Sequence, residues 1–185
     1  MADPFAQLTE EHEQIAAAVA VARNAAEAVA AYPDDESLIP AMLEELRGLQ
    51  RFMARELALH IAREEQVIFP AFRALDGHDR LVDELLVQHD RVRERRALLD
   101  RVMAALEDHH DEVEQQSERL AERLAAAGAA PSPEVLRELL DGVRQLDWIL
   151  QGHFSDEEDD MFAPGAELFE PAELERLSAA MKEIQ

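Results

Sequence analysis

The most informative segment of this chain is His60-Ile-Ala-Arg-Glu64-Glu65-Gln-Val-Ile-Phe69. The chain repeats it 93 residues later as His153-Phe-Ser-Asp-Glu157-Glu158-Asp-Asp-Met-Phe162, with His, Glu, Glu and Phe at the same offsets. Residues four apart lie on one face of an α-helix, so each histidine points the same way as the glutamate four positions later. The two stretches therefore predict two helices that each present an imidazole and a carboxylate together.

A second, weaker pair of matching stretches carries one histidine each. Leu8…His12-Glu13…Ile15 is similar to Leu85…His89-Asp90…Val92, with an aliphatic residue four before the histidine, an acid after it and an aliphatic residue three after it. Apolar residues recur at three- and four-residue spacing along nearly the whole chain, and no stretch alternates with period two. All four histidines therefore fall on apolar stripes that are expected to face the core of a helical protein.

Proline, glycine and capping residues divide the chain into five predicted helices. We expect them at about Phe5–Ala31, from a Ser37 cap to about Phe69 or Leu75, from near Asp79 to Ala127, from a Ser132 cap to about Phe162, and at Pro171–Lys182. Pro70 with Gly77 marks the end of the second helix, and Ala163-Pro164-Gly165 the end of the fourth. This pattern predicts an all-α fold, an up-down-up-down four-helix bundle with a short C-terminal fifth helix. Residues 1–185 form one predicted domain, with the bundle core at about 5–165 and the last helix at about 171–183.

The third predicted helix is longer than the geometry of a simple bundle requires. The spacing from His12 to His60 is 48 residues, whereas that from His89 to His153 is 64. The excess predicts either a break near Glu107–Asp111 with a packed extra helix, or an overhang of about 25 Å. An isolated overhang of that length is marginal in water, so the second alternative implies burial in a homodimer.

Composition narrows the function classes. Asp and Glu number 41 against 18 Lys and Arg, so the formal net charge is −23. A surface this acidic repels phosphate backbones and anionic headgroups, which argues against nucleic-acid or membrane partners. The absence of cysteine excludes disulfides and thiolate metal sites, and the N-terminal residues lack the pattern of a signal peptide, which predicts a cytoplasmic protein. Chemistry must therefore come from histidine, carboxylates or a cofactor.

The bundle geometry brings the motif residues to one level. With alternating helix directions, all four histidines lie roughly 10–15 Å from the same end of the bundle. The set forms a candidate ligand shell for two metal ions, with one glutamate from each of two helices able to span both: His12, His60, Glu64, His89, His153 and Glu157. Imidazole and carboxylate donors without sulfur suit iron, manganese or zinc. A single buried histidine is more often a hydrogen-bonded core residue, but four in register favour a metal site. The other histidines, His78, His109 and His110, are expected to be solvated or structural.

These motifs resemble the hemerythrin-like family, also called the HHE cation-binding domain, over about residues 5–165. His60-x-x-x-Glu64-Glu65 with Phe69-Pro70 and His153-x-x-x-Glu157-Glu158 with Phe162 carry the resemblance, and His12 and His89 fit the family's single histidines. The resemblance implies a non-haem di-iron centre with Glu64 and Glu157 as bridging carboxylates. Two positions depart from the oxygen-carrying hemerythrins: Arg93 replaces a second histidine four after His89, and Glu157 at i+4 replaces an aspartate at i+5.

Three functions follow as hypotheses. The first is a di-iron protein that binds, senses or reacts with O₂, peroxide or nitric oxide, since one imidazole fewer leaves more open coordination. Whether it turns over as an enzyme, such as a peroxide-decomposing oxidoreductase, stays open at this stage, and no catalytic residue is predicted. The alternative is an iron-responsive or iron-donating module without turnover. The third is a helical interaction protein without metal.

Three further features have sequence-based interpretations. Arg93 either pairs with acids on the helix surface, or neutralises the bridging carboxylates or stabilises a peroxide-like anion at the metals. Phe5, Phe69 and Phe162 are expected to seal the end of the bundle above the metals. Trp148 is expected to pack.

Overall fold

The computed structural model describes residues 3–75, 77–120 and 132–184, with the side chains of these residues except 105–120. Every regular element in these ranges is helical and no strand is among them. The predicted all-α class is therefore confirmed. The elements are α1 (Pro4–Ala31), α2 (Leu38–Phe52), η1 (Met53–Leu57), α3 (Ala58–Arg63), η2 (Glu64–Ile68), α4 (Phe69–Arg73), α5 (Asp79–Leu120), α6 (Pro133–Glu157), η3 (Glu158–Phe162), α7 (Ala163–Leu168) and α8 (Pro171–Glu183).

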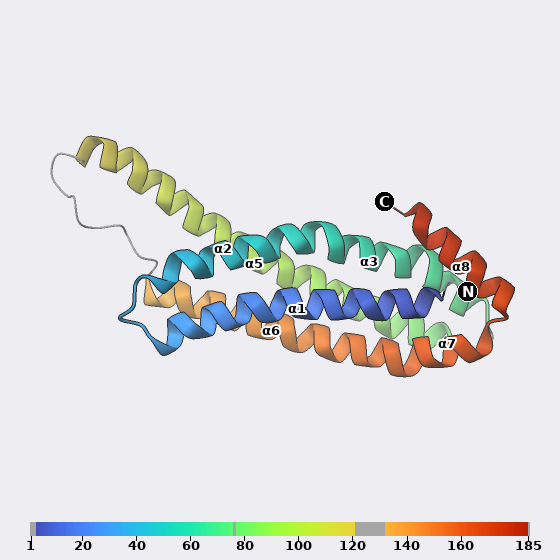
Figure 1. Cartoon of the computed structure of the whole chain (residues 1–185). Coiled ribbons are helices and arrows are strands. Elements are labelled where there is room, and N and C mark those ends of the chain that lie inside the picture. The colour runs from blue at the N-terminus through green and yellow to red at the C-terminus, as the bar shows by residue number, and fades with distance from the viewer. Residues whose placement is uncertain (1–2, 76, 121–131, 185) are drawn as a thin grey trace.

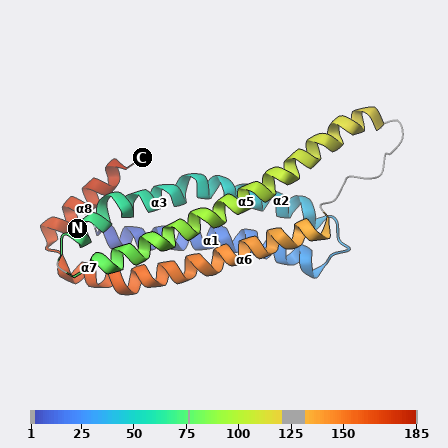
Figure 2. The ribbon, with the colours of Figure 1, turned by 180° about the vertical axis from the view of Figure 1, so that it is seen from behind.

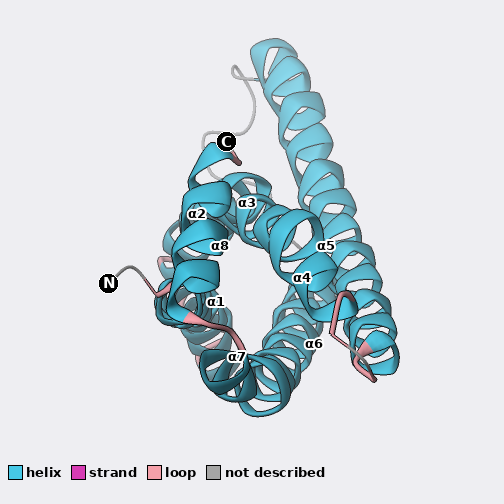
Figure 3. Cartoon of the chain, turned by 90° about the vertical axis from the view of Figure 1, so that its right-hand side faces the viewer, coloured by secondary structure: helices cyan, strands magenta, loops and turns pink. Residues whose placement is uncertain are grey.

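The long helices lie side by side as a bundle (Figure 1). Helix α1 packs against α2 and α6, and α5 packs against α6, α4 and α2. The view along the bundle shows these segments surrounding a common axis (Figure 3). Short α8 crosses one end and contacts α1 and η2. Within the described part of the chain, no helix combines the length and apolarity needed to cross a bilayer.

Most predicted helix starts are confirmed, although one of them lacks the capping hydrogen bond. Asp3 caps α1 by accepting from the backbone N–H of Phe5, and Ser132 caps α6 by accepting from that of Val135. Ser37 occupies the N-cap position of α2 as predicted, but its side chain makes no capping hydrogen bond to that helix. Its hydroxyl instead donates to Asp35 Oδ1 at 2.5 Å, in the preceding turn.

The predicted end of the fourth helix at Ala163-Pro164-Gly165 is wrong, because the helical path continues through Pro164 to Leu168. Of the two predicted ends of the second helix, Leu75 is the nearer one, because the path continues through Pro70 to Arg73. Each proline lies in the first turn of a new α segment, where no helical N–H partner is needed. A π-helical turn precedes each one, with Phe69 N–H bonded to Glu64 O and Ala163 N–H bonded to Glu158 O. The two repeated stretches therefore share a π-helical turn as well as a sequence pattern. Such π turns are frequent at functional sites.

Helix α5 is continuous from Asp79 to Leu120, so the predicted break near residues 107–111 is wrong. Its C-terminal part leaves the bundle and projects beyond the neighbouring helices, as Figures 1 and 2 show. The overhang alternative therefore holds, and its burial by a second copy stays a prediction. The expected continuation to Ala127 and the start of the break at Gly128 lie outside the described residues.

Two apolar clusters fill the described core, one on each side of a polar layer. The larger occupies the middle and far part of the bundle and includes Val19, Leu46, Leu99 and Leu146. The smaller closes the end near α8 with Phe5, Phe69, Phe72, Phe162 and Phe169 among its members. The Phe5 ring stacks on Phe162 with centroids 5.6 Å apart. The predicted aromatic seal is therefore confirmed, with Phe72 and Phe169 added.

The seal depends on a close approach at Gly165. A β-carbon placed there would lie 2.6 Å from Phe5 Cζ and 2.8 Å from Phe72 Cζ. We expect Gly165→Ala to lower the free energy of unfolding by about 1–3 kcal/mol, because the packed rings must shift. Gly142→Ala in α6 is the matched control: nothing lies within 4 Å of its added methyl group, and better helix propensity should stabilise by up to about 1 kcal/mol. Urea unfolding measures both, and equal effects of the two variants would contradict this account of the seal.

Candidate metal centre

The structure brings the six predicted residues together in the polar layer. His12 comes from α1, His60 from α3, His89 from α5 and His153 from α6. Glu64 starts η2 and Glu157 ends α6. All six side chains are buried, and both glutamates are 0% exposed. Two carboxylates without solvent need compensating positive charge, because an uncompensated buried charge is strongly destabilising.

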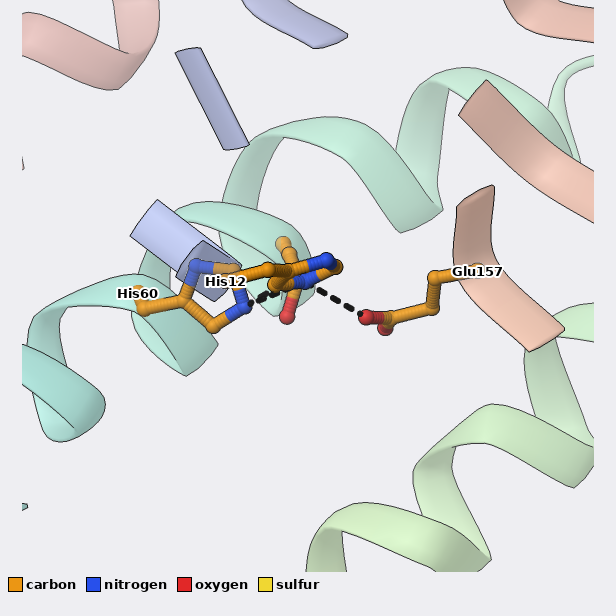
Figure 4. Close-up of side chains that lie close together, drawn as sticks. His12, His60 and Glu157 are labelled. Carbon is orange, nitrogen blue, oxygen red and sulfur yellow. Dashed lines mark hydrogen bonds and ion pairs between the residues drawn. The ribbon is translucent and has the colours of Figure 1, made fainter. Parts of the chain in front are cut away.

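The first group of converging atoms joins His12, His60, Glu64 and Glu157. The Nε2 atoms of the two histidines are 3.1 Å apart. Glu157 Oε2 lies 3.2 Å from His12 Nε2, and Glu64 Oε1 lies 3.3 Å from His60 Nε2. Figure 4 shows His12 between His60 and Glu157, with the three side chains pointing toward one another.

The second group joins His89 and His153 to the same two glutamates. Glu64 Oε2 lies 3.2 Å from His89 Nε2, and Glu157 Oε1 lies 3.3 Å from His153 Nε2. Each glutamate thus presents one oxygen to each histidine pair. In both groups every ligand atom lies within 4.8 Å of the others, a spacing at which one cation can contact them all.

The inner atoms of this layer lack hydrogen-bond donors. Both carboxylate oxygens of Glu64 and of Glu157, and the Nε2 atoms of His89 and His153, are buried without a hydrogen-bond partner. The close His12–His60 contact joins two Nε2 atoms whose rings already donate through Nδ1. Buried polar atoms are normally satisfied, so a set of lone pairs facing one space is what a cation site requires. The residues present therefore fit two metal ions.

Four outer hydrogen bonds orient the four imidazoles. His12 Nδ1–H donates to Glu158 Oε1 at 2.8 Å, and His89 Nδ1–H donates to Glu65 Oε1 at 2.9 Å. His60 Nδ1–H donates to Glu11 Oε2 at 3.1 Å, and His153 Nδ1–H to Gln88 Oε1 at 2.8 Å. A donating Nδ1 leaves the Nε2 lone pair directed inward, as metal ligation requires.

Sequence reasoning missed these four partners, although their signal was present. The carboxylates that orient His12 and His89 are the second glutamates of the two repeated stretches, Glu158 and Glu65. The other two partners, Glu11 and Gln88, each precede a histidine of the weaker pair. Polar acceptors at matching positions in both repeats were therefore the clue.

Protons take the place of cations when the layer holds no metal. Burial works against the ionised form of Glu64, but His60 and His89 outweigh it and set the pKa of Glu64 at about 2. Burial and the neighbouring Glu64 charge raise the pKa of Glu157 well above its usual value. Burial opposes the imidazolium of His89, yet the carboxylates of Glu157 and Glu64, which lie 3.6 and 3.2 Å from its Nε2, raise its pKa to about 10. Burial lowers the pKa of His12 and of His153 to about 3.

Arg93 does not neutralise the shared glutamates. Its Nη2 donates to Glu65 Oε1 at 2.6 Å and its Nη1 donates to Asp90 Oδ1 at 3.1 Å. The surface-pairing interpretation is therefore the right one, with the addition that Glu65 is also the acceptor of His89.

Two other interpretations are tested by the described side chains. Trp148 is 77% exposed, so the expectation that it packs is wrong. His78 lies outside the cluster against the Phe72 ring, which fits a structural role. The side chains of His109 and His110 lie outside the described ones.

Comparison with known protein families gives one match. Residues 3–107 match the family described as the hemerythrin HHE cation-binding domain. The match contains His12, His60, Glu64 and His89, while the other two residues of the cluster come from α6, beyond it. No curated protein matches the chain.

The pKa shifts predict how acid affects the protein after treatment with a chelator. Between about pH 6 and 5 the unfolded chain protonates His12, His89 and His153. The folded protein, with the pKa values of His12 and His153 at about 3 and that of His89 at about 10, protonates only His89 among them. Folded Glu157 holds one proton that the unfolded chain lacks. The unfolded state therefore gains a net proton, and stability falls with decreasing pH by up to about 1.4 kcal/mol per unit. Urea unfolding at several pH values measures this slope. His153→Gln removes one of the two proton acceptors and should bring it close to zero; an unchanged slope would contradict the assignment.

Proposed function

This chain belongs to the hemerythrin HHE cation-binding domain family, and we propose that it holds a non-haem di-iron centre that binds, senses or reacts with O₂, peroxide or nitric oxide. Its ligands in this proposal are His12, His60, Glu64, His89, His153 and Glu157. We further propose that residues 1–185 are one hemerythrin-like domain whose four long helical segments run up-down-up-down.

One observation carries the proposal: the two glutamates are shared. Glu64 and Glu157 each direct one oxygen toward the His12–His60 pair and the other toward the His89–His153 pair. A carboxylate that faces two cation positions holds both ions at a set spacing, and its negative charge offsets part of their charge. Nitrogen and oxygen donors without sulfur suit iron, with manganese or zinc as other candidates.

The chain's own residues supply binding, orientation and exclusion of water. Two iron ions, when bound, supply redox chemistry and open positions for a small ligand. The six side chains hold the ions, and the outer hydrogen bonds fix the imidazole rings. The aromatic seal of Phe5, Phe69, Phe72, Phe162 and Phe169 closes the end of the bundle, which keeps the layer dry and strengthens every electrostatic contact in it.

An iron-responsive or iron-donating module is the second candidate. The observation that favours it is the pair of uncompensated buried carboxylates, because cation binding would then stabilise the fold strongly and a partner could read that change. Both candidates require the same ions, and turnover separates them.

Metal content tests the ligand assignment. After anaerobic loading with Fe²⁺ and gel filtration, we expect about two irons per wild-type chain by elemental analysis. Glu64→Gln and Glu157→Gln should each lose iron from both positions, because each removes the negative charge that both groups share and replaces one ligand oxygen by an amide nitrogen that cannot bind a cation. Asp160→Asn is the matched control: this exposed carboxylate lies one turn after Glu157 and outside both groups.

Chelation gives the complementary measurement. Bound iron at a hundredfold excess over its dissociation constant should stabilise the fold by about 2.7 kcal/mol, so a chelator should lower the melting temperature of the wild type. Negligible iron together with an unchanged melting temperature would exclude both metal functions and leave a helical interaction protein.

Peroxide decomposition separates reaction from binding alone. We expect the iron-loaded wild type to consume H₂O₂ faster than an equal concentration of free Fe²⁺, because the buried layer holds both ions together. Glu64→Ala should reduce the rate at least about tenfold, and Asp160→Asn should not change it. Full iron loading with no rate above free iron would instead support the iron-responsive module.

A further inference from the structure

We propose that the two metal positions are unequal, and that Gln88 makes the position between His89 and His153 the weaker, more readily exchanged one. This inference rests on the proposed di-iron function and adds a residue that sets the affinity of one position. The inner ligands do not distinguish the positions, since each consists of two imidazoles and one oxygen from each shared glutamate. The difference lies in what the imidazoles donate to.

Glu11 and Gln88 occupy matching places in the two halves of the bundle. Each directly precedes a cluster histidine in its own helix, and each accepts a hydrogen bond from the histidine of the neighbouring segment. Glu11 Oε2 accepts from His60 at 3.1 Å, and Gln88 Oε1 accepts from His153 at 2.8 Å. One acceptor is a carboxylate and the other a neutral amide. A carboxylate on Nδ1–H makes the imidazole a stronger donor to a metal, and such outer partners change affinity about 10- to 100-fold.

The other side chains around the histidines do not cancel this difference between Glu11 and Gln88. Glu158 accepts a hydrogen bond from His12 and Glu65 accepts one from His89, so each position has one such carboxylate. Arginines also match: Arg63 Nη1 lies 2.5 Å from Glu11 Oε1, and Arg93 Nη2 lies 2.6 Å from Glu65 Oε1. The side chains that accept directly from the imidazoles therefore carry two negative charges around the His12–His60 position and one around the His89–His153 position. Each set has one paired arginine, and Arg93 is itself also paired with Asp90. Glu158 is 40% exposed and Glu11 only 16%, so Glu11 contributes the less screened charge.

The two positions also differ in how near they lie to a surface groove, although a phenylalanine stacks on a histidine of each, Phe69 lying on His89 with centroids 5.3 Å apart. The His12 ring is stacked on Phe154, with centroids 3.9 Å apart, and on Phe162 at 5.4 Å. His153, in contrast, contributes to the lining of a surface groove between α5 and α6, together with Gln88 and exposed Trp148. The groove has a volume of about 800 Å³. The His89–His153 position therefore lies nearest a route by which an ion or small ligand could exchange.

A hydrogen-bond chain leads from this position to the groove surface. His153 donates to Gln88, and Gln88 Nε2–H in turn donates to Asp156 Oδ2 at 2.8 Å. Asp156 is exposed, so water screens its charge. Placing the carboxylate at position 88 and the amide at position 156 would bring the negative charge into direct contact with His153. The double variant Gln88→Glu/Asp156→Asn does this without changing the net charge of the protein.

Titration of the chelator-treated protein with Co²⁺ tests the inference, with calorimetry for affinity and the visible spectrum for coordination. For the wild type we expect two steps, the second about 10- to 100-fold weaker than the first. His153→Gln should weaken or remove the second step, and His60→Gln the first, which assigns each step to a position. The double variant should tighten the second step toward the first and leave the first unchanged.

Matched variants make the result decisive. Asp156→Asn alone should leave the Co²⁺ affinity of both steps within about twofold of the wild-type values. Glu11→Gln should weaken the affinity of the first step about 10- to 100-fold, so that the two steps merge. Circular dichroism of each variant verifies that it folds. When Co²⁺ is released from the wild type to a chelator, we expect a fast kinetic phase, and His153→Gln should abolish that phase. Two equal steps in the wild type, or a double variant that leaves the second step unchanged, would overturn the inference while the di-iron proposal stands. Absence of any Co²⁺ or Fe²⁺ binding would instead remove the proposed function itself.

Discussion

Two glutamate side chains are fully buried in one polar layer, and none of their four oxygens makes a hydrogen bond of good geometry; this constraint shapes the rest of the site. Charge in such a place must be compensated, by protons on Glu157 and His89 or by cations. Because the polar layer lies between two apolar clusters, water cannot compensate it. The same apolar packing that stabilises the bundle therefore favours cation binding at the centre, as the proposed function requires.

The repeat explains how one chain builds this layer with approximate symmetry. Each half supplies one helix with a single histidine and one with a histidine and a glutamate four residues later. Each half also ends its second helix with a π turn, a phenylalanine and a proline-containing turn. The outer hydrogen bonds follow the same pairing and depart from it at one place, where Gln88 stands in the position of Glu11. The proposed difference in cation affinity between the two positions rests on this one exchange of a carboxylate for an amide.

Particular residues show how far sequence reasoning extended. His12, His60, His89 and His153 were predicted to share a level, and their Nε2 atoms do converge, because helix periodicity and rise determine both face and depth. Pro164 favours a helix end in the sequence, yet the helical path continues through it, because the π turn that precedes it shifts the hydrogen-bond frame and has no recognisable composition. Trp148 was expected to pack, since a lone indole is usually partly buried, yet its side of α6 faces the groove.

By itself, the sequence determined the helical class, the six converging side chains and the aromatic seal, because each follows from periodicity within a helix and from the spacing between helices. Only the tertiary structure decided what the outer nitrogens of the histidines contact, which glutamate oxygen faces which histidine pair, and that α5 continues past residue 111. These features depend on the rotation of each helix about its axis and on side-chain conformations across helix interfaces. Packing between segments far apart in the chain sets those quantities, and local sequence patterns do not encode them.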